Sequence, residues 1–279
     1  MTDVVIVGGG AVGLSLAYEL ACRGRKVTLL DKGDVGRESS WAGAGIVPPA
    51  GAVSARSPLA PLAAASAALH VEWHRKLLQE TGIDNGYRLC GATYLADTPE
   101  LKAELEAEAD LWRAQGVDHR LLDATELRHV EPALDDPHAA GRTPAAYHLP
   151  GEAQLRNPWH LRALESACTA RGVRILVRAE VESFVVHGDR LREVRTPVGS
   201  FSAERFCLCA GAWSGPLGEQ LGLRLAVKPI RGQIVLLRPS QPVIRGIVYA
   251  GHQFRHYFVP RDDGRILVGS TEEDVGFDK

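Results

Sequence analysis

The chain has 279 residues, of which 45% are hydrophobic and 24% are charged, and its formal net charge is -2. These values are ordinary for a soluble protein that buries a large core in one domain or in two interleaved ones. Near-neutral charge without a long run of Lys or Arg argues against nucleic acid as the main partner, so we expect small molecules as partners.

The first 31 residues predict a strand, a helix and a second strand. Residues 3–7 form a short β-branched run, typical of a buried parallel strand, and glycines follow it directly. Apolar residues then recur at helical spacing up to Gly24, which is placed to end the helix. Residues 26–31 predict the second strand.

The glycines of this unit have the spacing G-x-G-x-x-G, and an acid ends the second strand. The first glycine permits a tight turn, the second lets the backbone approach a pyrophosphate, and the third lets helix and strand pack closely. The acid can accept both hydroxyls of an adenosine ribose, which disfavours NADP. The motif alone leaves FAD, NAD and a merely structural turn open. The residues expected at this site are Gly8, Gly10, Ala11, Val12, Gly13, Asp31 and Lys32.

The stretch SSWAGAGI follows the second strand and consists mostly of small residues. One interpretation is a structural loop with a single buried tryptophan. The other is a cofactor loop, in which small residues let backbone N–H groups reach phosphate oxygens or a flat ring, and two serines add hydroxyl donors. The residues concerned are Ser39, Ser40, Trp41, Ala42, Gly43, Gly45 and Ile46.

Further along the chain, residues 61–81 and 101–115 predict helices. Asn157 and Pro158 are expected to cap and start a helix through Ala170, and alternating strands dominate residues 173–210. Another helix is expected to begin near Ser214. Tyr257 alternates with Val259 on a predicted strand, where a tyrosine is commonly half-buried.

The cysteines and histidines do not indicate a metal or redox site. Five cysteines without Cys-x-x-Cys spacing fit a reducing cytoplasm, and Cys207 and Cys209 are expected to be buried on one strand face. His252 and His256 are expected to be exposed. The N-terminus is not typical of a secretion signal, because Asp3 is acidic and glycines interrupt the apolar run, and no stretch is long and apolar enough to span a bilayer.

The chain resembles the D-amino-acid oxidase family of FAD-dependent oxidoreductases, most closely its glycine oxidases of thiamine biosynthesis. The resemblance rests on VVIVGGGAVGLSLAYELACRGRKVTLLDKG, SSWAGAGIVPP, RNPWHLRAL, CAGAWSG, VKPIRGQIVLL and YFVPRDDGRILVGSTEEDVGFD. It implies an α/β fold with a discontinuous Rossmann-like FAD-binding domain, residues 1–82 and 144–221. It also implies a mixed-sheet α+β substrate domain, residues 83–143 and 222–279.

The resemblance also assigns site residues. It implies that SSWAGAGI lies along the pyrophosphate and flavin ring and that the Val181 backbone meets the adenine. Ala210, Gly211 and Trp213 would close over the cofactor, although Trp213 is equally typical of a core aromatic. The Tyr257 hydroxyl would meet the substrate carboxylate, and Glu272 would border the active site without an assigned role.

The implied reaction is oxidation of glycine, or of a related small amine or D-amino acid, by O2. It gives an imine, then a 2-oxo acid and ammonia, and releases H2O2, and the flavin needs little acid or base from the protein. The alternatives are an oxidase or dehydrogenase of D-amino acids or sarcosine with the same fold, and an inactive flavin-binding protein. Self-association into a homo-oligomer is compatible with each of them.

The family pattern continues beyond residue 279. It includes an arginine that binds the substrate carboxylate in a bidentate pair, followed by a glycine-rich strand and a helix around the flavin ring. Arg231, Arg255 and Arg261 are not expected to replace that arginine. The resemblance therefore implies that these 279 residues are a fragment of a longer protein or an incomplete enzyme.

Overall fold

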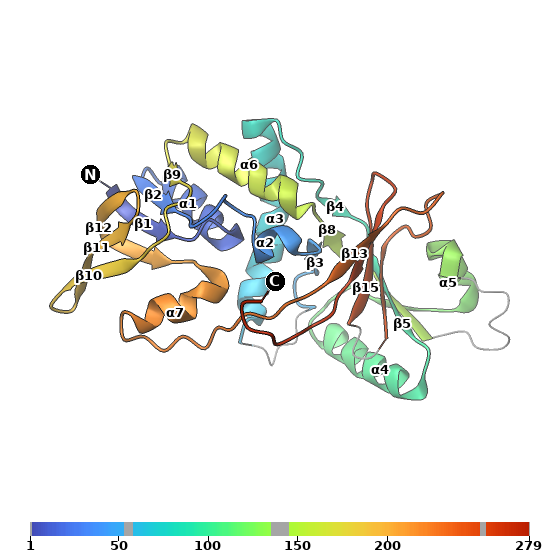
Figure 1. Ribbon diagram of the computed structural model, residues 1–279. Helices are drawn as coiled ribbons and strands as arrows, with labels where there is room; N and C mark the ends of the chain where they lie inside the picture. The colour runs from blue at the N-terminus through green and yellow to red at the C-terminus, as the bar shows by residue number, and fades with distance from the viewer. Residues whose placement is uncertain (1, 53–57, 135–144, 252–254, 279) are drawn as a thin grey trace.

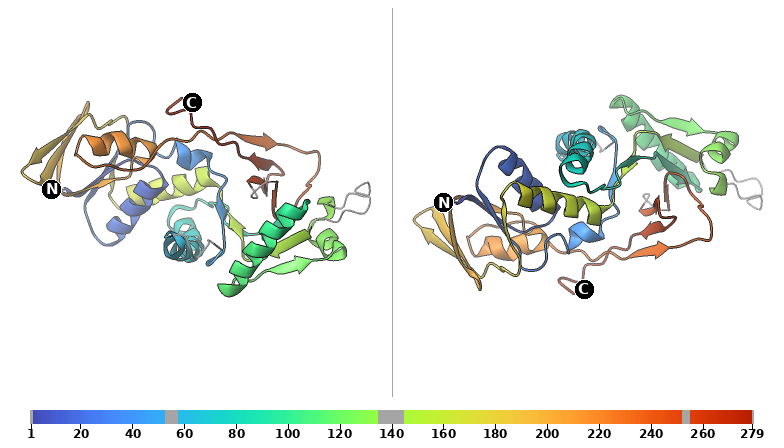
Figure 2. Two further views of the ribbon diagram at one scale, coloured as in Figure 1. Left: turned by 90° about the horizontal axis from the view of Figure 1, so that it is seen from below. Right: turned by 90° about the horizontal axis from the view of Figure 1, so that it is seen from above.

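The computed structural model describes residues 2–52, 58–134, 145–251 and 255–278. In this part of the chain a six-stranded sheet and a seven-stranded sheet lie toward opposite ends of an elongated molecule (Figures 1 and 2). Three short strands form a small sheet between them. These are β3 (Ile46–Val47), β8 (Ala153–Gln154) and β4 (Arg88–Leu89), in that order.

The six-stranded sheet has the order β10-β11-β12-β1-β2-β9, with β12, β1, β2 and β9 parallel. Its strands, in chain order, are β1 (Thr2–Val7), β2 (Val27–Leu30), β9 (Arg174–Leu176), β10 (Ser183–His187), β11 (Arg190–Thr196) and β12 (Gly199–Leu208). The predicted strand, helix and strand at the N-terminus are confirmed, as are the strands between residues 173 and 210.

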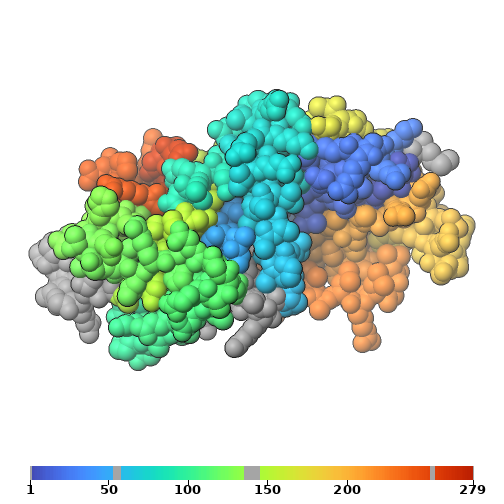
Figure 3. Space-filling view, turned by 180° about the vertical axis from the view of Figure 1, so that it is seen from behind, coloured from blue at the N-terminus to red at the C-terminus, as the bar shows by residue number. Residues whose placement is uncertain are grey.

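Helices cover one face of this sheet. α1 (Ala11–Cys22) and α6 (Asn157–Ala170) pack on each other, and α3 (Ala60–Thr81) packs on α6. Figure 3 shows α3 running across the middle of the molecule, between its two ends. The other face carries a second apolar cluster, which includes Leu217 of α7 (Ser214–Glu219). Parallel strands covered on both faces explain the apolar run from Val4 to Val7, which is buried throughout.

The seven-stranded sheet is mixed and has the order β13-β16-β15-β14-β5-β7-β6. Among the described strands of this sheet, only β5 and β14 pair in parallel. α4 (Pro99–Ala114) packs on one face, and α5 (Ala124–Val130) lies next to an apolar cluster on the other. Its strands are β5 (Ala92–Ala96), β6 (Arg120–Leu122), β7 (Ala145–Leu149), β13 (Ile234–Leu237), β14 (Ile247–Ala250), β15 (His256–Pro260) and β16 (Ile266–Gly269).

The fold class expected from the sequence, α/β with a second mixed sheet, is confirmed. The division into two discontinuous domains stays a prediction. β7 follows the expected boundary at residue 144 and yet pairs with β5 and β6 of the seven-stranded sheet. A boundary that follows the sheets would therefore fall after Leu149.

Predicted helix positions agree with the structure to within two residues, but one predicted cap is wrong. α6 begins at Asn157, its N-cap residue is Arg156, and Pro158 lies in its first turn as expected. The Asn157 side chain does not cap the helix; its Nδ2 instead donates to the backbone oxygen of Ser40, 2.9 Å away. The amide thus ties α6 to α2 (Ser39–Ala42).

Cys207 and Cys209 pack against the same apolar core under α1, as two residues on one strand face should. They are half-buried rather than buried, which corrects the expectation. Burial raises the pKa of both thiols, that of Cys209 to about 11. His256 is exposed as expected, and His252 lies outside the described residues.

Candidate cofactor and substrate site

The glycine turn between β1 and α1 is closed by two glycines that tolerate no side chain. A β-carbon on Gly13 would lie 1.9 Å from the backbone oxygen of Gly8. Gly8 has a φ of 105°, and a β-carbon there would lie 2.3 Å from the backbone oxygen of Cys209. The turn, the start of α1 and the end of β12 are therefore in direct backbone contact, as a dinucleotide-binding turn requires.

Gly10 occupies a more open position. It is the N-cap residue of α1, and a β-carbon there would meet only the Ser40 side chain, with Oγ at 3.0 Å. Ser40 Oγ accepts the Ala11 N–H at 2.9 Å, at the positive end of the helix. The Ser40 hydroxyl proton remains available for an anion bound at the same place. This arrangement suits a pyrophosphate.

Asp31 directly follows β2, and both of its carboxylate oxygens accept backbone N–H groups, one of them from the glycine turn. Oδ2 accepts the Gly9 N–H at 2.7 Å, and Oδ1 accepts the Gly33 N–H at 2.8 Å. Each carboxylate oxygen has a further lone pair for a ligand hydroxyl. The two backbone bonds fix the orientation of the carboxylate, which the sequence pattern does not reveal.

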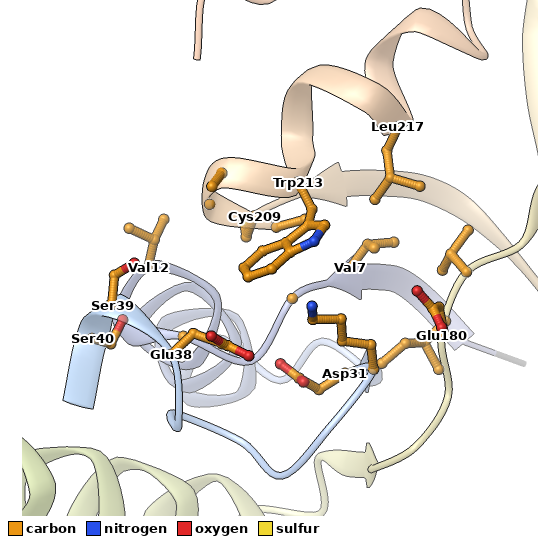
Figure 4. A pocket seen from close by; sticks show the side chains of 18 of the residues that line it. Val7, Val12, Asp31, Glu38, Ser39, Ser40, Glu180, Cys209, Trp213 and Leu217 are labelled. Carbon is orange, nitrogen blue, oxygen red and sulfur yellow. The ribbon is translucent and has the colours of Figure 1, made fainter. Parts of the chain in front are cut away.

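A cavity of about 410 Å³ lies over the turn, between the carboxyl ends of β1 and β2 and helix α7. Figure 4 shows Trp213 across this cavity from Asp31, with Ser39 and Ser40 at one end. The Lys32 ammonium lies 3.3 Å from the centroid of the Trp213 ring, so the two side chains form a cation–π contact across the cavity. The predicted residues that line it are Gly8, Gly10, Ala11, Val12, Asp31, Lys32, Ser39, Ser40, Val181, Ala210, Gly211 and Trp213.

A second cavity, of about 610 Å³, lies among α1, α3, α6 and β3. It shares Ala11, Val12 and Ser40 with the first cavity, so the two meet at the start of α1. Gly45 and Ile46 also line it, as do His70 and Asn157. The residues that line one cavity or the other thus extend from Asp31 past the N-terminus of α1 to β3.

The polar atoms of the second cavity indicate that a ligand belongs there. His70 Nδ1 and Asn157 Oδ1 are buried and have no hydrogen-bond partner among the described residues. Buried polar atoms without a partner are rare in folded proteins, and a bound polar group would satisfy them. The residues present around the two cavities thus fit FAD.

Four residues of SSWAGAGI line neither cavity, namely Trp41, Ala42, Gly43 and Ala44. The Trp41 ring lies under the Arg37 guanidinium, 3.9 Å from its central carbon. A β-carbon on Gly43 would lie 2.5 Å from Asn157 Nδ2, and one on Gly45 would lie 2.1 Å from the backbone oxygen of Leu155. These glycines are therefore required by the close approach of the chain at α6, a reason that the sequence does not reveal.

Tyr257 belongs to a row of tyrosines on one face of the seven-stranded sheet. It lies directly opposite Tyr249 on β14, Tyr249 lies opposite Tyr94 on β5, and Tyr94 lies opposite Tyr147 on β7. Residues directly opposite each other share a face of the sheet. Ala44 and Ile46 pack against this face, in the same apolar cluster as Tyr257. Its role as a carboxylate ligand stays a prediction.

The three arginines named above have other partners. Arg261 is buried and donates to the backbone oxygens of Ala44 and Leu155 and to Gln154 Oε1, at 2.7, 3.1 and 2.9 Å. Burial lowers the pKa of Arg261 to about 10. Arg231 pairs with Glu273 and Asp278, and Arg255 pairs with Glu272. Arg261 thus ties the end of β15 to the β3–β8 segment.

Two buried titratable residues escape the sequence patterns. Glu152 is fully buried, and both of its carboxylate oxygens accept tyrosine hydroxyls. His160 on α6 is buried between Trp73 and His70, and its Nδ1 lies 3.1 Å from Asn85 Nδ2. A charged or polar residue within an apolar stretch, as in LPGEAQL, is the signal that could have revealed Glu152.

Two other kinds of site were sought in the described part of the chain. There, no group of three or more His, Cys, Asp or Glu side chains is arranged to hold a metal ion. None of the helices in the same ranges combines the length and the apolar character needed to cross a bilayer.

Comparison with known proteins shows which family the chain belongs to. Residues 3–279 match the family model of the FAD dependent oxidoreductases, DAO. Glycine oxidase from Pseudomonas putida is 35% identical over 278 residues, which cover 99% of this chain and 73% of that protein. The crystal structure of glycine oxidase from Geobacillus kaustophilus superposes with a TM-score of 0.91 at 33% identity, covering 99% of this chain and 72% of that one.

The structure of an iminodiacetate oxidase from a Chelativorans species is also similar, with a TM-score of 0.83 and 28% identity, covering 99% of this chain and 73% of that one. The matches thus extend over nearly the whole chain and over both sheets. The family match, the glycine turn and the two joined cavities agree on one cofactor. The chain belongs to the DAO family of FAD-dependent oxidoreductases, is similar to glycine oxidases, and uses FAD.

Proposed function

We propose that the protein oxidises glycine, or a closely related small amine, with O2. Overall, amine, O2 and water would give a 2-oxo acid, ammonia and H2O2. FAD, when bound, accepts the hydride from the α-carbon and passes the electrons to O2. The chain's own residues bind and orient the substrate and exclude water from it.

The observation that carries this proposal is the position of Tyr257. Its ring lies on the sheet face against which Ala44 and Ile46 pack, and Ile46 also lines the second cavity. The Tyr257 hydroxyl would donate to the substrate carboxylate, and the apolar neighbours would exclude water from the reacting carbon. Asp31 would accept the ribose hydroxyls, while Ser39, Ser40 and the N-terminus of α1 would hold the pyrophosphate.

A second candidate substrate is a secondary amine such as sarcosine. The similarity to an iminodiacetate oxidase, at 28% identity, favours it, because iminodiacetate is a secondary amine that carries carboxylates. A role in thiamine biosynthesis remains a prediction from the resemblance, and a cytoplasmic location and self-association remain predictions from the sequence.

The test is a visible absorption spectrum of the FAD-loaded chain during anaerobic addition of glycine, sarcosine and D-alanine. We expect glycine to bleach the flavin band at a lower concentration than the other two. Preferential bleaching by sarcosine or D-alanine would assign the alternative substrate. A bound flavin that no amine bleaches would contradict the proposal and favour the inactive flavin-binding protein.

A further inference from the structure

Glu152 lies next to the tyrosine row without belonging to the cofactor cavities. Its carboxylate accepts the Tyr249 hydroxyl at 2.6 Å and the Tyr94 hydroxyl at 3.1 Å, and these two rings are stacked with centroids 4.4 Å apart. The Glu152 backbone oxygen accepts the N–H groups of Cys90 and Gly91. Main chain and side chain are thus both held in place.

Tyr249 separates Glu152 from Tyr257. Tyr249 and Tyr257 lie directly opposite each other on neighbouring strands, where side chains on the same face are in contact. The Tyr249 hydroxyl donates to Glu152. Tyr257, the predicted ligand of the substrate carboxylate, is therefore separated from the buried acid Glu152 by one side chain, that of Tyr249.

No cation neutralises this acid within the part of the chain that the structure describes. The titratable groups that face Glu152 are Tyr94 on β5, Tyr249 on β14 and the Cys90 thiol before β5. Burial raises the pKa of Glu152 to about 7, although both tyrosine hydrogen bonds lower it. Burial also raises the pKa of both tyrosines and of Cys90, so these three groups remain protonated while Glu152 changes its charge.

We propose that Glu152 is a specificity-determining residue, which places a buried negative charge behind Tyr249 and thereby disfavours simple carboxylate anions relative to amino acids. This inference rests on the proposed function. A ligand bound to Tyr257 through its carboxylate is repelled by ionised Glu152, because charges interact strongly where water is excluded. The ammonium group of an amino acid offsets that repulsion, and a hydroxy acid has no such group.

Glycolate, which carries a hydroxyl in place of the amine of glycine, is the probe. Its affinity for the FAD-loaded chain is measured from the perturbation of the flavin spectrum between pH 5.5 and 8.5. We expect the glycolate Kd to rise about fivefold or more through neutral pH, while the Kd or KM of glycine changes less. In Glu152→Gln, which keeps the size of the side chain, glycolate should bind equally well across this range.

Two further variants separate this role from a structural one. Tyr249→Phe removes a hydrogen bond that lowers the pKa of Glu152, so the pH step in glycolate affinity should move to higher pH. Glu131→Gln is the matched control, because Glu131 is another fully buried acid whose pKa is raised by burial. It accepts the backbone N–H groups of Arg245 and Gly246 instead of tyrosine hydroxyls, and its replacement should leave the glycolate step in place.

An infrared titration of the carboxylic acid carbonyl band follows Glu152 without turnover. The band should disappear with a midpoint near neutral pH and be absent from Glu152→Gln. If the Glu152 carbonyl band titrates as expected but the glycolate affinity shows no pH step, the Glu152 proposal is overturned and the proposed function is not. Failure of glycolate to bind even to Glu152→Gln would also overturn the Glu152 proposal. A flavin that no amine bleaches would instead overturn the proposed function and leave Glu152 as a structural acid.

Discussion

The Tyr257 ring lies flat against Gly269, its partner on the neighbouring strand, and occupies the space that a side chain there would need. A β-carbon on Gly269 would lie 2.5 Å from the Tyr257 hydroxyl oxygen and 2.6 Å from the ring carbon that bears it. Gly269→Ala should therefore displace the Tyr257 hydroxyl. Loss of a hydrogen bond to a carboxylate costs about 1.5–3 kcal/mol, so we expect KM for glycine to rise about tenfold or more. Steady-state oxygen consumption measures this.

Tyr257→Phe provides the comparison, because it removes the same hydroxyl and leaves Gly269 unchanged. If both changes act on one hydrogen bond, the double variant should be no worse than the poorer single variant. FAD affinity should be unchanged in all three. Additive losses would show that Gly269 acts through something other than Tyr257.

Gly13 and Gly10 should respond differently to alanine, although they belong to one motif. Gly13→Ala places a methyl group against the Gly8 backbone, which cannot move away without disturbing β12. We expect a loss of about 1–3 kcal/mol in the free energy of unfolding and poor retention of FAD. Gly10→Ala meets only the Ser40 side chain and should weaken FAD binding with little change in stability.

Urea unfolding of the FAD-free chain and fluorescence titration with FAD separate these two effects. Equal stability losses in Gly13→Ala and Gly10→Ala would contradict the prediction, since only one of the two β-carbons meets backbone.

The glycine turn was predictable because its requirements are local. Gly8, Gly13 and Asp31 lie within 24 residues of one another, and their spacing fixes the strand, the turn and the helix together. The α/β class was implied by the family resemblance, and the periodicity of the first 31 residues agrees with it. Tyr257 was correctly placed on a strand, half-buried, because alternation along a strand is also local.

The surroundings of Glu152 and Asn157 could not be predicted in the same way. Tyr94 and Tyr249 reach Glu152 from strands 58 and 97 positions away in the chain. Asn157 has the residue type of a helix cap, but its amide bonds to Ser40, 117 positions away, because the two segments meet in the fold. Local propensity cannot show which distant backbone atoms compete for a side chain.

Arg261 should stabilise the junction between the two large sheets. Arg261→Met removes the donors to three acceptors, on Ala44, Leu155 and Gln154, and each buried acceptor left without a partner costs about 1–3 kcal/mol. We expect a marked fall in the denaturant midpoint. Arg265→Met is the matched control, since Arg265 is more exposed and forms a surface pair with Asp263, worth about 0–1 kcal/mol. A similar loss in both variants would contradict a specific role for Arg261.

His160 should make the folded chain sensitive to mild acid. Burial, with a smaller contribution from His70, lowers the pKa of His160 from 6.5 to about 4. Between these pH values the unfolded chain binds more protons at this residue than the folded one, so stability is lost as the pH falls from 6.5 to 4. At about 1.4 kcal/mol per pKa unit, the loss reaches about 3 kcal/mol.

His160→Gln removes this titration, so its unfolding free energy should decrease less than that of the unchanged chain over this range. Glu152 has the opposite effect, because its raised pKa removes stability as the pH rises toward 7. This effect is the same in the unchanged chain and in His160→Gln, so it cancels when their unfolding free energies are subtracted. His187→Gln, at the exposed end of β10, controls for the loss of an imidazole. Parallel stability curves for the unchanged chain and His160→Gln between pH 6.5 and 4 would show that His160 is not held neutral by its burial among Trp73, His70 and Asn85.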